Sequence, residues 1–360
     1  MRTTAGDPAP WDRFGALAQS TKGLLWPVQH RVAEWDDVVM TRVVVGQADR
    51  VVGTLVGAAC GDALGVPYEL GHPPAGAPAM VGGGLGPYAP GEWSDDTQMS
   101  ICIARVAAEG ADLTAESALD AVASAFDQWR ADGATDIGTH TGAVLEAAAR
   151  DTGSPAARLR LTGLARAADG YQTAGNGALM RTGPVPLSSL DDRDHAADAA
   201  KEVARLTHAD PLAAESCILW GEAIRVAVLE RRLDVRAGLD LLPSARQALW
   251  AAYLDEADSE PPISFSNNGF TVVALQAAWS SIRSAAAAAT PLAHVVDALT
   301  TAIGIGTDTD TVASIAGQLL GACYGTSAFP DRWREDVHGW PGLRADDLAD
   351  LALRTAGLGP

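Results

Sequence analysis

The sequence predicts a single compact all-α domain, and three observations lead to this prediction. Hydrophobic residues make up 48% of the 360 residues, enough for a sizeable core. Many of them are alanine, the strongest helix former, as in residues 285–289. Apolar residues recur at helical spacing along the chain, and no run alternates apolar and polar residues as a half-buried strand does. The sequence motifs of dinucleotide-binding folds, P-loop proteins, zinc proteases and serine hydrolases are absent.

Residues 1–46 are predicted to form an N-terminal helical extension, and residues 47–360 to form the main domain. The extension carries Trp11, Trp26 and Trp35 among scattered charges. In one interpretation these tryptophans pack on the main domain, since docking is what orders a terminus. In the other, the extension is an arm that binds a protein partner.

Helical spacing of apolar residues recurs through the main domain. The segments are residues 47–64, 97–109, 115–129, 141–149, 196–206, 212–229, 244–254, 269–287, 292–303, 311–324 and 345–355. Residues 71–91 are rich in glycine and proline and predict a long loop, and loops of this length are often functional. Residues 255–268 are polar and predict a second loop.

Glycine recurs every fourth residue in two of the predicted helices. The two series are Gly57, Gly61 and Gly65, and Gly317, Gly321 and Gly325. Residues four apart share one helix face. Each glycine in a helix interior costs about 1 kcal/mol relative to alanine, so a close approach between packed helices is expected to offset that cost.

Composition excludes several classes of function. The formal net charge of −19 makes nucleic acid an unexpected partner, because binding it requires a basic face. The sequence has no secretory signal and no run of about 18 uncharged apolar residues, so neither secretion nor a membrane span is expected. The cysteines are far apart and predict small core residues of a reduced, cytoplasmic protein.

A first acidic motif lies within residues 91–99, where a predicted helix begins. It contains Ser94, Asp95 and Asp96. Helix capping alone explains one such side chain, since serine or aspartate accepts from the free N–H groups and acids suit the helix dipole. Two adjacent carboxylates with neighbouring hydroxyl groups exceed what one cap needs.

A second acidic motif, residues 304–311, precedes another predicted helix and repeats this chemistry with Asp308, Asp310 and Thr311. These are hard oxygen ligands, which suit Mg²⁺ or Mn²⁺ and not zinc. If the two motifs face each other, four carboxylates converge, and like charges at that density favour protonation unless cations are present. Two divalent cations would resolve the repulsion.

Five segments together resemble the ADP-ribosylglycohydrolase family, which includes dinitrogenase reductase-activating glycohydrolases and eukaryotic ADP-ribosyl hydrolases. The segments are residues 61–69, 94–97, 175–181, 207–208 and 308–311. They occur in the family's order and span about residues 48–330. The resemblance implies a multi-helix orthogonal bundle around a dinuclear metal site.

The resemblance also assigns metal ligands. It implies that Ser94, Asp95 and Asp96 bind metal together with a second set from the other acidic motif. That second set is Asp308, Asp310 and Thr311. Asp62 matches a family position, and we expect it to support the ligands from behind.

Further roles are implied for residues outside the two motifs. Glu69, on the glycine- and proline-rich loop, would touch metal or hold the attacking water. Asp136 matches an acid of the arginine-specific bacterial branch, although a helix cap is an alternative. Catalytic roles are therefore expected for Glu69, Asp96 and Asp136.

The resemblance places four residues at the bound substrate: Thr173, Asn176, Gly177 and His208. Thr173 and Asn176 fall in the segment that contacts the diphosphate in relatives. Residues 175–177 taken alone predict only a turn. His208 taken alone is equally typical of a hydrogen-bonded core histidine.

The implied activity is metal-dependent hydrolysis of the N-glycosidic bond between ADP-ribose and a protein side chain, with arginine favoured. It would reverse ADP-ribosylation, with an ADP-ribosylated protein and ADP-ribose as partners. Two alternatives remain: a hydrolase of serine- or acetyl-linked ADP-ribose, and an immunity or partner-blocking protein that acts through residues 1–46.

Overall fold

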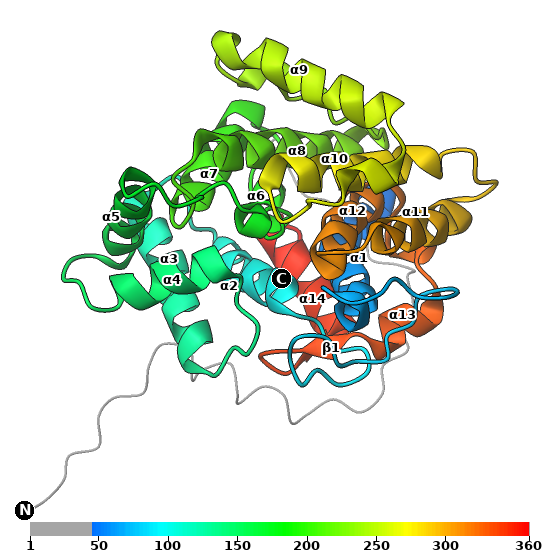
Figure 1. Ribbon diagram of the computed structural model, residues 1–360, viewed down its shortest axis with the longest axis horizontal. Coiled ribbons are helices and arrows are strands. Elements are labelled where there is room, and N and C mark those ends of the chain that lie inside the picture. The colour runs from blue at the N-terminus through cyan, green and yellow to red at the C-terminus, as the bar shows by residue number, and fades with distance from the viewer. Residues whose placement is uncertain (1–44, 360) are drawn as a thin grey trace, which may run out of the picture. The chain divides into compact units, whose positions relative to one another are not determined.

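The computed structural model describes residues 45–359, in which α-helices are joined by loops, short 3-10 turns and one small hairpin (Figure 1). The α-helices are α1 (Val45–Gly65), α2 (Asp95–Ala107), α3 (Glu116–Ala131), α4 (Thr139–Ala148), α5 (Pro155–Ala168), α6 (Pro184–Leu187), α7 (Arg193–Arg205), α8 (Pro211–Glu230), α9 (Ser244–Ser259), α10 (Thr271–Ser284), α11 (Pro291–Ile305), α12 (Thr309–Tyr324), α13 (Asp331–Asp336) and α14 (Ala345–Thr355). The 3-10 turns are η2 (Val66–Tyr68), η3 (Asn176–Ala178), η4 (Leu239–Leu241), η5 (Pro262–Phe265) and η6 (Thr326–Ala328). Strands β1 (His338–Gly339) and β2 (Leu343–Arg344) pair antiparallel. The all-α fold class is thus confirmed.

Helices α1 and α12 form the centre of the fold, side by side and antiparallel (Figure 1). The glycines explain this contact. A methyl group on Gly53, Gly57 or Gly61 would overlap a backbone carbonyl of α12. The facing carbonyls belong to Gly321, Gly317 and Ala313 respectively. The predicted close approach is confirmed, and alanine at these positions would force the two backbones apart.

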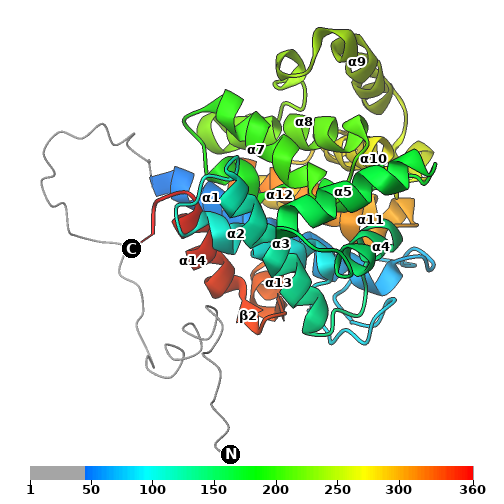
Figure 2. The same ribbon diagram turned by 90° about the vertical axis from the view of Figure 1, so that its left-hand side faces the viewer.

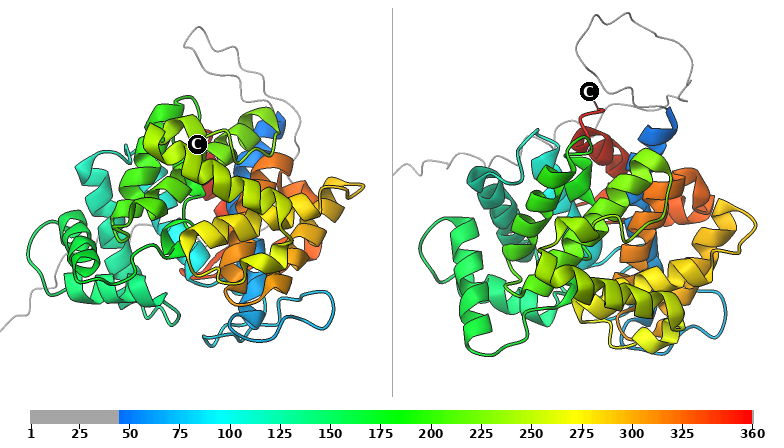
Figure 3. Two further views of the ribbon diagram at one scale, coloured as in Figure 1. Left: turned by 45° about the horizontal axis from the view of Figure 1, so that its top comes forward. Right: turned by 90° about the horizontal axis from the view of Figure 1, so that it is seen from above.

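The remaining helices surround this pair. Helices α2, α8, α10 and α11 all contact α12, and α14 contacts α1. Helix α9 lies at the periphery, where it contacts α10 (Figure 2). Helices α3, α4 and α5 form a group at one side, where α3 contacts α2 and α5 pairs with α7 through Arg160 and Glu202 (Figure 3).

The close α1–α12 contact also fixes the ends of the two helices. Gly65 at the end of α1 lies directly against the backbone of Asp310 in the first turn of α12. The hydroxyl of Thr309 donates to the carbonyl oxygen of Gly65 at 2.8 Å. The end of α1 and the start of α12 therefore form one rigid corner.

All the predicted helices are present, and the structure contains further helices and a hairpin that the sequence pattern does not predict. These further elements are α5, α6, α13 and the β1–β2 hairpin. Helix α9 also continues to Ser259, into the segment expected to be a loop. Tertiary contacts explain the extension: Asp258 pairs with Arg236 at 2.6 Å and accepts from the indole of Trp279 at 2.8 Å.

Residues 1–44 lie outside the described part of the chain, so both interpretations of the N-terminal extension remain predictions. Among the described residues, one helical stretch, Gly46–Tyr68, has the length and apolar character needed to cross a membrane, and 83% of its most apolar window is buried within the protein. That stretch is α1 with η2, the central helix of the core.

Candidate metal centre and active site

The two acidic motifs meet, as the sequence predicted. Oxygen atoms of Asp62, Asp96 and Asp310 all lie within 4.8 Å of one another, and so do those of Glu69, Asp308 and Asp310. The hydroxyl of Thr311 donates to Oδ2 of Asp96 at 3.3 Å across the two helix N-termini. Asp310 belongs to both groups and therefore lies at their centre.

Helix capping does not account for the acids at the start of α2. Ser94 is the N-cap residue, yet its side chain makes no capping hydrogen bond. Asp62 of α1 caps the helix instead: its Oδ1 accepts from the Ser94 N–H at 2.9 Å, and its Oδ2 accepts from the Thr97 N–H at 3.0 Å. The side chains of Asp95 and Asp96 are consequently not needed to cap α2.

Asp62 has no remaining capacity to bind an ion strongly. Besides the two N–H groups, it accepts the hydroxyl of Ser94 at 2.7 Å and that of Thr97 at 2.6 Å. These four donors occupy the lone pairs of both Asp62 oxygens. The carboxylate is otherwise close enough to Asp96 and Asp310 to share a cation with them. Asp62 therefore orients Ser94 and the start of α2, in line with the supporting role expected for it.

The acids at the start of α12 are held by two asparagines. Asn176 Nδ2 donates to Asp308 Oδ2 at 2.7 Å. Asn268 Oδ1 accepts from the Asp308 N–H at 3.0 Å, and Asn268 Nδ2 donates to the carbonyl of Gly306 at 3.1 Å. Asn268 is not predicted as a site residue from sequence, because nothing distinguishes it from its neighbour Asn267 in a polar loop.

Glu69 lies where two strained backbone segments meet. Leu70 and Thr307 adopt positive φ angles of 49° and 65°, which non-glycine residues rarely do. The Leu70 N–H donates to the Thr307 carbonyl at 2.7 Å. Strain of this kind persists only where surrounding structure enforces it, often at functional sites. Here it holds Glu69 beside Asp308.

Asp136 comes to this site from the loop between α3 and α4. It does not cap α4, whose N-cap is Gly138. Burial and, after it, the negative charges of Asp136, Asp308 and Asp95 together raise the pKa of Glu69 to about 9. The pKa of Asp136 is also raised, mainly by burial. Glu69 and Asp136 thus form a carboxyl pair in which one member retains a proton when cations are absent.

Within residues 45–359, the charges that act most strongly on the carboxylates of the cluster are those of other acids. Burial, and then repulsion from neighbouring carboxylates, raises the pKa of Asp95, Asp96 and Asp310 well above the usual range. Oδ1 of Asp96 is buried and makes no hydrogen bond within the described residues. An unpaired buried carboxylate oxygen among like charges fits a bound cation, and the all-oxygen donor set fits a hard divalent one.

The predicted substrate-binding residues lie mostly together. Asn176 contacts the cluster through Asp308, and Gly177 lies against His208, since a methyl group on Gly177 would be 3.3 Å from the His208 ring. His208 is buried, and burial holds its pKa well below the usual value. Thr173 is buried in the same segment, and no hydrogen bond within residues 45–359 joins its hydroxyl to the cluster.

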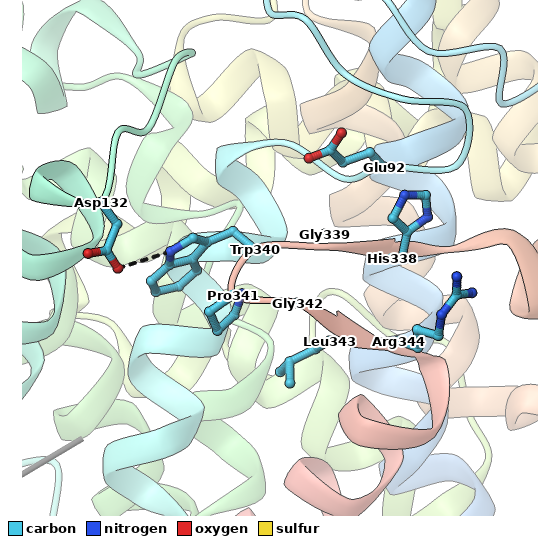
Figure 4. Close-up of a pocket in the computed structure, with 9 residues that line it drawn as sticks. All are labelled: Glu92, Asp132, His338, Gly339, Trp340, Pro341, Gly342, Leu343 and Arg344. Carbon is cyan, nitrogen blue, oxygen red and sulfur yellow. Dashed lines mark hydrogen bonds between the residues drawn. The ribbon is translucent and has the colours of Figure 1, made fainter. Parts of the chain in front are cut away.

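A hollow elsewhere on the protein lies at the β1–β2 hairpin (Figure 4). Residues 338–344 line it together with Glu92 and Asp132. The indole N–H of Trp340 donates to Asp132 at 3.2 Å, which ties the hairpin to the end of α3 (Figure 4). The carboxylates of the acidic cluster do not line this hollow.

The hairpin instead binds the residues that immediately precede α2. The His338 N–H donates to the Gly91 carbonyl, and the Trp93 N–H donates to the His338 carbonyl, both at 3.0 Å. The indole of Trp93 donates to the Trp340 carbonyl at 3.1 Å. The three residues before Ser94 are therefore clamped on the hairpin, which fixes where α2 begins.

The fold and the site together define a helical protein with a buried acidic centre, and comparison with known proteins gives its family. A family model described as ADP-ribosylglycohydrolase matches residues 44–359. The chain therefore belongs to the ADP-ribosylglycohydrolase family, as its motifs indicated.

Several relatives are similar over most of the chain. The ADP-ribosylarginine hydrolase Tri1 of Pseudomonas putida is 29% identical over 300 residues, which cover 80% of this chain and 74% of that protein. The ADP-ribosyl-[dinitrogen reductase] glycohydrolase of Rhodospirillum rubrum is 26% identical over 300 residues, covering 79% and 89%. A solved structure described as an ADP-ribosylglycohydrolase-related protein complex superposes with a TM-score of 0.68 at 28% identity, covering 88% of this chain and all of that one.

Proposed function

We propose that this protein removes ADP-ribose from arginine side chains of modified proteins, with two divalent cations, Mg²⁺ or Mn²⁺, at the acidic centre. The observation that carries the proposal is the meeting of the two acidic helix N-termini around Asp310. The relatives described as ADP-ribosylarginine hydrolases support the arginine linkage.

Six residues of the two motifs would hold the cations. They are Ser94, Asp95, Asp96, Asp308, Asp310 and Thr311. Bound cations would supply positive charge that orients the ribose hydroxyls and makes a nearby water more acidic. Because Asp62 accepts the hydroxyl proton of Ser94, the lone pairs of that hydroxyl remain available.

Glu69 and Asp136 would divide the proton transfers between them. The Glu69 carboxylate would hold the attacking water and take its proton as the oxygen bonds to the anomeric carbon. The carbon–nitrogen bond to arginine breaks with its electron pair on nitrogen, and Asp136 would pass to that nitrogen the proton that the Glu69–Asp136 pair holds. The products would be ADP-ribose and the unmodified arginine side chain, which leaves as guanidinium.

The contact between Glu69 and Asp136 favours arginine over the alternative linkages. Two adjacent carboxyl groups provide an acid and a base at once, and their joint negative charge suits a cationic leaving group. A serine or acetyl leaving group gains less from that charge, because it departs uncharged or as an anion.

The test is incubation with arginine-linked and serine-linked ADP-ribosylated proteins, each with Mg²⁺, with Mn²⁺ and after exhaustive chelation. We expect release of ADP-ribose from the arginine-linked protein only, and only with a divalent cation. Equal or faster release from the serine-linked protein would overturn the arginine assignment, and unchanged release after chelation would overturn the cation requirement.

A further inference from the structure

Arg181 is a buried cation without an acidic partner in contact. Its side chain is completely buried, and within residues 45–359 it forms no ion pair. Its guanidinium lies 4.8 Å from the ring centre of Phe126, and Nη1 reaches only the sulfur of Met99 at 3.7 Å. Burial lowers its pKa to about 10, which still leaves it charged at neutral pH. Burying a charge in this way is unfavourable for folding, so a role other than stability is expected.

The strongest hydrogen bond of Arg181 determines how a hydroxyl is oriented. Arg181 Nη2 lies 2.7 Å from Thr207 Oγ1, and a guanidinium can only donate. The Thr207 oxygen therefore accepts this bond, and its single hydrogen is free to donate elsewhere. The neighbouring acceptor is Nδ1 of His208, at 2.8 Å.

The relay of hydrogen bonds from Arg181 through Thr207 to His208 favours one tautomer of His208. Because the Thr207 oxygen already accepts from Arg181, its hydrogen is placed to donate to Nδ1 of His208, and the one proton of the neutral imidazole then resides on Nε2. Burial and the nearby Arg181 charge both disfavour the imidazolium form. His208 is thus a neutral ring with a defined N–H donor.

The donor faces the segment that contacts the acidic centre. Methyl groups on Gly175 or Gly177 would each lie 3.5 Å from Nε2 of His208. Asn176, between those glycines, donates to Asp308 in the acidic centre at 2.7 Å. Within the described residues, Nε2 of His208 makes no hydrogen bond, so the donor is available to a ligand.

Thr207 also contacts a second imidazole, that of His140, through its backbone carbonyl oxygen. Its carbonyl oxygen lies 3.0 Å from Nε2 of His140, and a carbonyl can only accept, so His140 also carries its proton on Nε2. The His140 ring meets that of His208 edge to face, with 4.7 Å between centroids. The hydroxyl and the carbonyl of Thr207 can therefore be tested separately.

We propose that Arg181 and Thr207 are positioning residues that fix His208 as a neutral Nε2–H donor to an acceptor oxygen of the ADP-ribosyl group. The proposal rests on the proposed function for its ligand, whereas the relay itself does not depend on it. With the other tautomer, His208 would present a lone pair to the substrate oxygen and repel it.

The first test measures the tautomer itself by nitrogen NMR of protein labelled with ¹⁵N-histidine, without ligand. In the wild type we expect the Nε2–H form for both His208 and His140. Thr207→Val removes the hydroxyl but keeps the carbonyl, so His208 should lose its single tautomer and populate both neutral forms, while His140 stays unchanged. Arg181→Met frees the Thr207 hydroxyl to accept and should have the same effect. A wild-type His208 with its proton on Nδ1, or an unchanged tautomer in both variants, would overturn the proposal.

The second test measures binding and turnover. Thr207→Val and Arg181→Met should weaken ADP-ribose binding and raise KM about tenfold, the loss expected for one hydrogen bond to the ligand, while kcat changes less than about threefold. Thr207→Ser keeps the hydroxyl and should restore both values. The matched control is Thr182→Val, which removes another buried threonine hydroxyl, one bonded to the Ala178 carbonyl at 3.0 Å, and should change neither tautomer nor KM.

The two proposals can fail separately. A wild-type protein with the expected tautomer that neither binds nor releases ADP-ribose contradicts the proposed function and the ligand assigned to His208. A wild-type enzyme active on arginine-linked ADP-ribose whose Thr207→Val form keeps its KM contradicts the positioning role alone. Loss of kcat with unchanged KM in both variants would also contradict it.

Discussion

Aspartates stand at the start of α7 and α8 and also at the start of α2 and α12, but their surroundings differ. Asp192 caps α7 by accepting from the His195 N–H at 3.0 Å, and Asp210 caps α8 by accepting from the Leu212 N–H at 2.8 Å. Neither Ser94 at α2 nor Asp308 at α12 makes a side-chain capping bond.

The difference lies in burial and in the neighbouring helix. Asp192 is exposed, so its carboxylate stays hydrated while it caps. At α2 the capping is transferred to Asp62 of α1, which leaves Asp95 and Asp96 buried among like charges. Aspartate at a helix N-terminus thus stabilises one helix and, at another, contributes to a buried acidic cluster that could hold a cation.

The largest effect is expected for Asp310→Asn, since Asp310 belongs to both carboxylate groups. Loss of a central cation ligand should reduce hydrolysis by about a thousandfold or more. In chelator near neutral pH, the same variant should melt at a higher temperature than wild type, because asparagine stays neutral there without having to bind a proton.

Asp192→Ala is the control for this prediction. It should cost about 1 kcal/mol of stability through loss of a cap and leave hydrolysis unchanged. Near-normal hydrolysis by Asp310→Asn would mean that the acids of α12 serve only the helix.

Glu69→Gln tests whether Glu69, which lies next to Asp308, acts as the general base of the reaction. The variant should bind ADP-ribose almost normally and turn over about 10²–10⁴ times more slowly, the usual loss for a general base. Calorimetric affinity beside single-turnover rates separates binding from chemistry. A rate within a few-fold of wild type would contradict the assigned role.

Asp62→Asn tests whether capping of α2 by Asp62 also positions the proposed metal ligands at the start of that helix. An amide can accept through only one oxygen, so either Ser94 or Thr97 loses its acceptors and faces an NH₂ group instead. We expect a loss of about 0.5–2 kcal/mol in stability and of about 10–100-fold in Mn²⁺ affinity. If metal affinity stays unchanged while stability falls, Asp62 caps α2 without positioning the ligands.

The smallest effect is a pH dependence that should exist only without cations. The folded-state pKa of Glu69 is raised from 4.5 to about 9, so its protonated form is favoured by folding. Its contribution to the stability of metal-free protein is therefore fully present below pH 4.5 and is lost as the pH rises toward 9.

Thermal unfolding in chelator should accordingly show a steeper fall in Tm with rising pH for wild type than for Glu69→Gln. Adding Mn²⁺ should reduce the difference. Parallel pH profiles for the two proteins in chelator would show that Glu69 is not the titrating group.

Most of the fold could be predicted from sequence, and the exceptions have physical causes. Helix α5 was missed because Leu161 and Leu164 are 65% and 57% exposed, so its apolar residues do not share one face. The β1–β2 hairpin has two-residue strands, too short for any alternation to show. By contrast, the glycine spacing of α1 and α12 is a local pattern with a direct packing consequence.

The site likewise has parts with a local sequence pattern and parts without one. The two acidic motifs are contiguous in sequence, so their residues could be predicted as a set. The saturation of Asp62 by Ser94 and Thr97, and the contact of Asn268 with Asp308, join residues far apart in the chain. Such contacts leave no local pattern, and only the folded arrangement reveals them.

On the proposed function, the N-termini of α2 and α12 form one acidic centre for two divalent cations, and hydrolysis depends on it. The most direct measurement is calorimetric titration of chelator-treated protein with Mn²⁺, with arginine-linked ADP-ribose release followed on the same samples. We predict about two Mn²⁺ bound per chain, activity that rises in parallel with occupancy, and loss of both in Asp310→Asn. Full hydrolysis by protein shown to contain no divalent cation would contradict the account.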